Sequence, residues 1–106
     1  MADKLILLKE LKNSLQKGYQ DSVKDIILFG SQAYGNPTEN SDYDVLIVLK
    51  KDYTAKDENQ IYDLCYDINL KYNIVIDAHL ISERELGTIK GKQLIFTKAI
   101  KSGIYA

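Results

Sequence analysis

Apolar residues run without a break over Ile26–Phe29 and Val45–Leu49. Both runs are rich in β-forming residues, and uninterrupted apolar runs of this length indicate buried strands. With their flanking residues they predict strands over Lys24–Phe29 and Asp42–Leu49. A third run, Ile74–Ile81, predicts a third strand.

Two longer segments repeat apolar residues at helical spacing. Leucines at positions 5, 8, 11 and 15 predict a helix over 3–17, and a stripe that includes Ile61, Cys65 and Ile68 predicts one over Thr54–Tyr72. Thr54 and Asp57 match a capping box at the start of the second helix. Tyr62 and Tyr66 form an adjoining stripe, for which packing is the favoured interpretation and a partner-binding face the alternative.

The chain after the third strand predicts a further helix and a short strand. Ser82 and Glu85 match a second capping box, helical periodicity continues or resumes as far as Gly103, and Ile104-Tyr105 follow. The resulting order is α-β-turn-β-α-β-α, which predicts an α/β (α+β) fold. The helix between the second and third strands permits a parallel crossover, but the pattern leaves the strand order open.

Length and composition narrow the class of protein. The chain has 106 residues, of which 45% are hydrophobic and 27% charged, so we expect a single globular domain over 1–106. A net charge of −1 argues against general nucleic-acid binding, and the apolar run Leu5–Leu8 is too short for a membrane span. The single Cys65 cannot form an internal disulfide, which favours a cytoplasmic location.

Four residues, two just after the first strand and two at the start of the second, suggest a site. Asp42 and Asp44 are spaced so that both carboxylates project from one face of a strand. Their mutual repulsion would be relieved by a divalent cation. Gly30 allows an anion to approach the backbone, and Ser31 would begin a helical turn, where N–H groups favour phosphate. The simpler alternatives are an ordinary capped turn and two solvated loop acids.

The third strand adds further candidates. Asp77 interrupts an apolar run, where a carboxylate is costly without a partner; the alternative is an edge-strand acid that faces water. His79 shares the face of Asp77 and could approach the site, although an ordinary strand histidine is the favoured interpretation. Four lysines follow Leu86 with no acid, and a solvated basic face is favoured over contact with a triphosphate: Lys90, Lys92, Lys98 and Lys101.

The motif Gly30-Ser31, ten residues, Asp42-x-Asp44 resembles that of the DNA polymerase β-like nucleotidyltransferases, and of their minimal nucleotidyltransferase family in particular. The chain departs from the pattern at Tyr34, where many members have a basic residue. The resemblance implies a palm-like mixed β-sheet with helices packed on one side. It makes Asp77 the third carboxylate, so that Asp42, Asp44 and Asp77 would be the catalytic residues and would bind two Mg²⁺ ions.

The same resemblance implies a function and a partner. Gly30 and Ser31 would bind the nucleotide, with ATP as substrate, and AMP would be transferred to a helical HEPN-type toxin that the chain neutralises as an antitoxin. One alternative is a related binding module that neutralises by occlusion without chemistry. A second is a small-molecule (antibiotic) nucleotidyltransferase, which is disfavoured because the chain is short for enclosing an acceptor. Base preference, acceptor and homo-oligomeric state stay open.

Overall fold

The computed structural model describes residues 4–19, 22–34, 42–88 and 92–106. Along the chain the elements are α1 (Lys4–Tyr19), β1 (Val23–Phe29), α2 (Ser31–Tyr34), β2 (Tyr43–Leu49), α3 (Ala55–Tyr72), β3 (Ile76–Ser82), α4 (Glu83–Leu86), α5 (Leu94–Ser102) and β4 (Ile104–Tyr105). The three predicted strands and both long helices are confirmed, with ends within a residue or two of the predicted bounds. The loop predicted over 35–40 lies outside the described residues.

Both predicted capping boxes are present. Thr54 caps α3, and its hydroxyl accepts a hydrogen bond from the Asp57 N–H at 3.2 Å. Ser82 caps α4 in the same way, accepting from the Glu85 N–H at 3.2 Å. The helical segment predicted from Ser82 is two helices, α4 and α5, and residues 89–91 between them lie outside the description.

The four strands form one mixed sheet in the order β3-β2-β1-β4. β1 is antiparallel to β2 and to β4, whereas β2 and β3 are parallel. Helix α3 makes the crossover between the parallel strands, as parallel neighbours require. The register pairs Phe29 with Asp44 and Asp44 with Asp77, so three strands meet at this level of the sheet.

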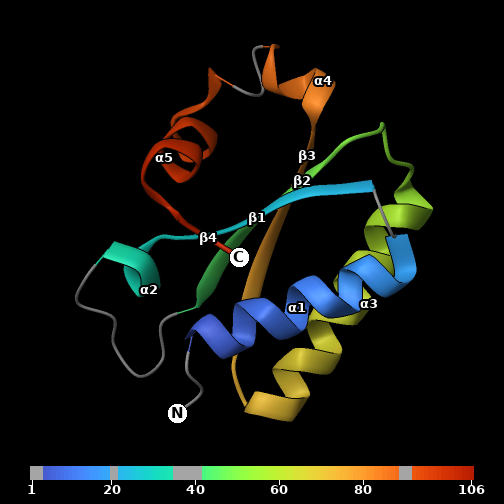
Figure 1. Cartoon of the computed structure of the whole chain (residues 1–106), viewed down its shortest axis with the longest axis vertical. Helices are drawn as coiled ribbons and strands as arrows, with labels where there is room; N and C mark the ends of the chain where they lie inside the picture. The colour runs from blue at the N-terminus through green and yellow to red at the C-terminus, as the bar shows by residue number, and fades with distance from the viewer. Residues whose placement is uncertain (1–3, 20–21, 35–41, 89–91) are drawn as a thin grey trace.

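Helices cover both faces of the sheet (Figure 1). α1 and α3 lie side by side on one face, where their apolar stripes and the strands form the larger buried cluster. α5 packs on the opposite face through Phe96 and Ala99, against a smaller cluster that includes Ile27 and Leu46. The expectation of helices on one side therefore holds for the two long helices, and α5 adds a cover on the other face.

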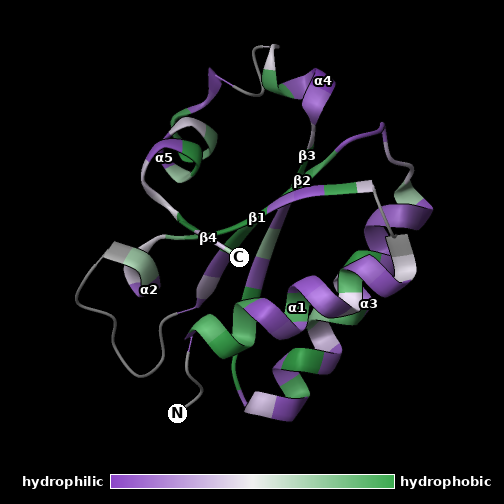
Figure 2. Ribbon diagram, in the orientation of Figure 1, coloured by the Kyte–Doolittle hydropathy of each residue, from purple (hydrophilic) through white to green (hydrophobic). Residues whose placement is uncertain are grey.

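Residue alternation along the strands explains this division. Tyr43, Val45 and Ile47 of β2 belong to the α1–α3 side, whereas Leu46 and Val48 belong to the α5 side. The strands are mostly apolar, as expected for a sheet covered on both faces. Polar and apolar residues alternate along α1 and α3 (Figure 2), as expected for amphipathic helices that are covered on one face. Among the described residues, no helix is long and apolar enough to cross a membrane.

Candidate functional site

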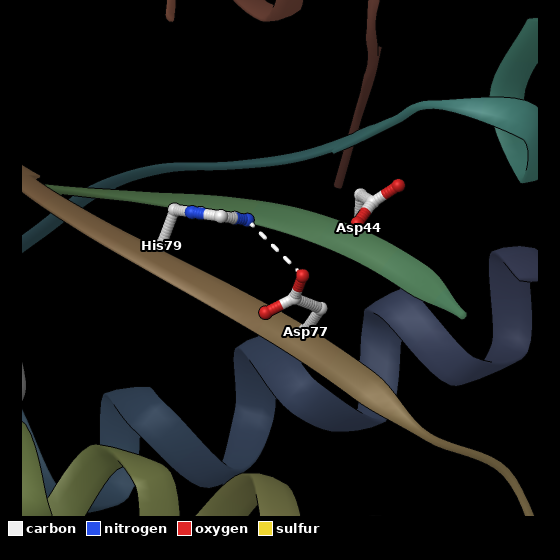
Figure 3. Close-up of side chains that lie close together, drawn as sticks. All are labelled: Asp44, Asp77 and His79. Atoms are coloured by element: carbon white, nitrogen blue, oxygen red, sulfur yellow. Dashed lines mark ion pairs between the residues drawn. The ribbon is translucent and has the colours of Figure 1, made fainter. Parts of the chain in front are cut away.

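Three side chains from the two parallel strands come together on the α5 side of the sheet. Asp44 extends from β2, and Asp77 and His79 extend from β3, all away from α1 and α3 (Figure 3). Asp44 and Asp77 are direct partners in the parallel register. One ligand atom from each of the three residues lies within 4.8 Å of the other two. We refer to Asp44, Asp77 and His79 as the acidic cluster.

Within the cluster, His79 and Asp77 are neighbours along β3. His79 Nε2 lies 3.5 Å from Asp77 Oδ2, because residues i and i+2 share a face of a strand. The imidazole ring also packs at a tilt of 52° against Phe29, with 5.6 Å between ring centroids. The Asp77 side chain is 53% exposed and that of His79 28%, so the cluster is open to a ligand while the ring is held in place.

The electrostatics of Asp44 are those of a crowded carboxylate. Burial raises the pKa of Asp44 most, and the negative charges of Asp77 and Asp42 raise it further, whereas His79 acts in the opposite direction. Burial and the neighbouring negative charges therefore disfavour the ionised form of Asp44, and a nearby positive charge would offset this effect. A bound cation would supply that charge.

Gly30 is fitted against the carboxylate of Asp44. It has a φ of +76°, a conformation that glycine adopts readily and other residues rarely do. A Cβ at this position would overlap Asp44 Oδ2 and lie 3.1 Å from Cγ. Ser31, which is exposed, then begins the single turn of α2, and the Ala33 N–H donates to the Gly30 carbonyl at 3.0 Å. The strand, turn and carboxylate are thus in contact.

Asp42 stands apart from the other predicted carboxylates. It precedes β2, is exposed, and is not a member of the acidic cluster, although its charge acts on Asp44. Of the predicted carboxylates, the structure therefore brings Asp44 and Asp77 together and leaves Asp42 outside the cluster. Tyr34 ends α2, and its side chain lies outside the described residues.

His79 is the residue whose place the sequence interpretation did not favour. The signal that could have found it is its spacing of two from Asp77, which put it on the same face. That signal becomes decisive only when the parallel register places Asp44 beside both residues.

A pocket of about 440 Å³ adjoins the cluster on the α5 side. It is lined by Phe29, Gly30 and Ser31 from the β1–α2 junction and by Leu94, Ile95 and Lys98 from α5. Because Phe29 pairs with Asp44 in the sheet, the pocket lies next to the carboxylate. Of the four C-terminal lysines, Lys98 lines this pocket, while Lys90 lies outside the described residues.

The donor set fits a divalent cation. The carboxylates of Asp44 and Asp77 offer oxygen, the ligand that Mg²⁺ prefers. An imidazole suits transition metals better than Mg²⁺. His79 therefore fits better as a hydrogen-bond partner of Asp77 than as a Mg²⁺ ligand.

Comparison with known proteins shows the family of this chain. The family model described as nucleotidyltransferase domain matches residues 8–101. Two proteins of Methanocaldococcus jannaschii, both provisionally named protein adenylyltransferases, are similar to this chain. One is 45% identical over 76 residues, which are 72% of this chain and 71% of that protein. The other is 39% identical over 70 residues, which are 66% of this chain and 71% of that protein.

Solved structures share the fold. A chain from the complex of a tri-AMPylated Shewanella oneidensis HEPN toxin with its MNT antitoxin has a TM-score of 0.57 at 16% identity, covering 97% of this chain and 71% of that one. A chain of the MntA–HepT toxin–antitoxin has a TM-score of 0.55 at 16% identity, covering 95% of this chain and 69% of that one. A chain of a toxin–antitoxin with AMP-PNP has a TM-score of 0.52 at 18% identity, covering 88% of this chain and 83% of that one. With the matched family model and the adenylyltransferase relatives, this chain belongs to the nucleotidyltransferase family.

Proposed function

We propose that this chain is a Mg²⁺-dependent protein adenylyltransferase that moves AMP from ATP to a hydroxyl group of a protein partner. The observation that carries the proposal is the register of β2 and β3, which places Asp44 beside Asp77 and next to Gly30. A pair of carboxylates beside a glycine turn can receive a metal–triphosphate, with metal and phosphate bound at adjacent points. The names of the curated relatives, which include AMP transfer to protein, support this choice of reaction.

Each site residue has a role in the proposal. Asp42, Asp44 and Asp77 hold the metal, and Asp77 also faces the acceptor from the exposed edge of the cluster. Gly30 and Ser31 bind the β- and γ-phosphates through backbone N–H groups and the Ser31 hydroxyl. His79, whose Nε2 lies 3.5 Å from Asp77 Oδ2, helps to fix the orientation of that carboxylate. Two bound Mg²⁺ ions, when present, would supply charge stabilisation for the departing pyrophosphate and lower the pKa of the acceptor hydroxyl.

The proposed transfer is a single displacement at phosphorus. The acceptor hydroxyl oxygen forms a bond to the α-phosphorus of ATP while the bond from that phosphorus to the α–β bridging oxygen breaks. Pyrophosphate leaves with the bond electrons, and Asp77 accepts the hydroxyl proton before releasing it to solvent. The protein contributes position and electrostatic complementarity, as in other phosphoryl-type transfers.

The partner in this proposal is a HEPN-type toxin, so the chain acts as an antitoxin in the cytoplasm. Fold neighbours come from toxin–antitoxin complexes, one of them with an AMPylated HEPN toxin, and the free Cys65 fits a reducing compartment. The alternative of neutralisation by occlusion predicts the same complex without chemistry. The antibiotic-modifying alternative has no specific support in the site.

Partner mass separates catalysis from occlusion. Wild type or Asp77→Asn is incubated with the co-purified partner, Mg²⁺ and labelled ATP, and partner mass and partner activity are followed. We expect added AMP and lasting neutralisation with wild type only, because Asp77→Asn is nearly isosteric and keeps the complex. If the variant neutralises equally well and neither form adds mass, the occlusion alternative replaces the proposal.

A further inference from the structure

β3 is an edge strand, and its pairing with β2 uses alternate residues. It stands first in the order β3-β2-β1-β4. The Tyr43 N–H donates to the Val75 carbonyl at 2.8 Å. Because bonding alternates along a parallel pair, Asp77 and His79 direct their backbone groups to β2. Ile76, Ala78 and Leu80 instead direct their backbone groups to the outer edge of the sheet.

This outer edge is satisfied at its ends and open at its centre. The Ile76 N–H donates to Asn69 Oδ1 at 2.8 Å, and the Tyr53 O–H donates to the Leu80 carbonyl at 3.2 Å. Between these points, the Ile76 carbonyl, the Ala78 N–H and carbonyl, and the Leu80 N–H have no hydrogen-bond partner among the described residues. Such a row of donors and acceptors is a template for an added strand.

Helix α3 carries an exposed apolar stripe, and a further exposed apolar residue precedes β3. Tyr62, Tyr66 and Leu70 recur every four residues on α3 with 40%, 59% and 65% of their surface exposed, and Val75, just before β3, is 55% exposed. Burial raises the pKa of Tyr62, and nearby negative charges that include Asp77 add to the effect. Because α3 contacts β3, the exposed stripe is on the helix next to the edge strand that carries the acidic cluster.

A strand added at the outer edge of β3 would lie beside the acidic cluster on one face of the sheet and would face α3 on the other. Strands pair at about 4.8 Å, and directly opposed side chains on one face lie about 5 Å apart at Cβ. Side chains of the added strand that oppose Asp77 or His79 would thus project onto the face of the acidic cluster. The alternate side chains would project onto the face of the sheet that α3 covers, and α3 carries the exposed Tyr62 and Tyr66.

We propose that the outer edge of β3 takes an extended segment of the acceptor protein as a fifth strand, which places the acceptor hydroxyl beside Asp77. The inference rests on the proposed function and adds how the partner is recognised: by main-chain pairing at Ala78, with its other face against Tyr62 and Tyr66. Occupation of this edge also brings protein over an acidic cluster that is otherwise half open to water.

Ala78→Pro tests the pairing. The Ala78 N–H points away from β2, so proline at this position removes the outward donor. The sheet is kept, because edge strands tolerate proline at such positions. Ala78→Ser, which keeps the donor, is the matched control. The probe is a set of nine-residue β-forming peptides with one central tyrosine or serine, with phenylalanine-centred and alternately N-methylated versions, in the presence of Mg²⁺ and labelled ATP.

Two readouts decide the inference. We expect the tyrosine or serine peptides to slow amide exchange at Ala78 and Leu80 at least tenfold in wild type, and the N-methylated peptides to have no effect. AMP transfer to peptide should be at least tenfold lower in Ala78→Pro than in Ala78→Ser, while ATP affinity is the same in both.

Three results would overturn it: equal transfer by Ala78→Pro and Ala78→Ser, peptide binding without protection at Ala78 and Leu80, or no peptide binding at millimolar concentration. Wild type that fails to bind ATP with Mg²⁺ would overturn the proposed function instead. The exchange measurement needs no nucleotide, so it still decides whether the edge pairs with peptide.

Discussion

At the scale of single residues, the position of Asp44 depends on the absence of a side chain at Gly30. The positive φ of Gly30 turns the chain from β1 into α2, and the space where a Cβ would stand is filled by the Asp44 carboxylate. The glycine thus brings the proposed phosphate-binding turn into contact with the proposed metal ligand. A substitution that is small in volume should therefore have a large effect on the site.

Gly30→Ala should displace Asp44 and weaken ATP binding at least tenfold in Mg²⁺ buffer. The positive φ alone should also cost about 1 kcal/mol or more in the free energy of unfolding. Gly87→Ala is the matched control, because Gly87 has a negative φ and its nearest atom would lie 3.8 Å from the new Cβ. Calorimetric titration and urea unfolding measure both quantities. ATP affinity equal to wild type in Gly30→Ala would contradict this account of the turn.

At the scale of elements, a polar contact joins the two long helices. Glu10 of α1 lies 2.7 Å from Lys71 Nζ of α3 through Oε1, and Glu10 Oε2 accepts a hydrogen bond from the Tyr72 hydroxyl. The hydrogen bond from Lys71, followed by that from Tyr72, lowers the pKa of Glu10. Since α3 leads directly into β3, this contact helps to fix the helix that precedes Asp77.

The Glu10 contact predicts a pH dependence of stability. A carboxyl group whose pKa is lowered on folding stabilises the protein fully above its unfolded pKa, about 4.3. That contribution is lost as pH falls through the lower folded value. Glu10→Gln should therefore be less stable than wild type at pH 7, and the two urea midpoints should converge as pH falls below 4. A constant difference between pH 7 and pH 3 would show that the charge of Glu10 is not involved.

Elements and their order were predictable from the sequence because each depends on local periodicity, apolar runs and caps such as Thr54. The meeting of Asp44 with Asp77 was not derivable from local pattern, because it requires the neighbouring positions and parallel register of β2 and β3. The place of His79 follows from the same register. α5 on the second face escaped prediction because its packing against Ile27 and Leu46 is a tertiary contact between distant segments.

At the scale of the whole molecule, the core between α1, α3 and the sheet separates Cys65 from solvent. Cys65 is 3% exposed, and burial raises the pKa of its thiol to about 11. A reagent for thiols therefore requires opening of the core, which makes Cys65 a reporter of global stability. The acidic cluster, in contrast, is on the other face of the sheet and open.

Labelling of Cys65 should report nucleotide binding at a distance. At pH 8 the native protein should react far more slowly than the urea-unfolded chain. Because a ligand that binds only the folded state suppresses opening, ATP with Mg²⁺ at about 100 times its dissociation constant should slow the reaction roughly a hundredfold. Mg²⁺ alone and ATP with EDTA are the controls. Fast labelling that nucleotide leaves unchanged would show that Cys65 is reached without opening the core.

The account depends most on the claim that the acidic cluster holds a metal–nucleotide. Calorimetric titration of ATP into wild type, Asp44→Asn and Asp77→Asn, each with Mg²⁺ and with EDTA, tests this claim most directly. We predict binding by wild type with Mg²⁺, and a loss of at least tenfold in affinity on adding EDTA or on replacing either aspartate. Equal affinity of wild type in Mg²⁺ and EDTA, or undiminished binding by both variants, would contradict it.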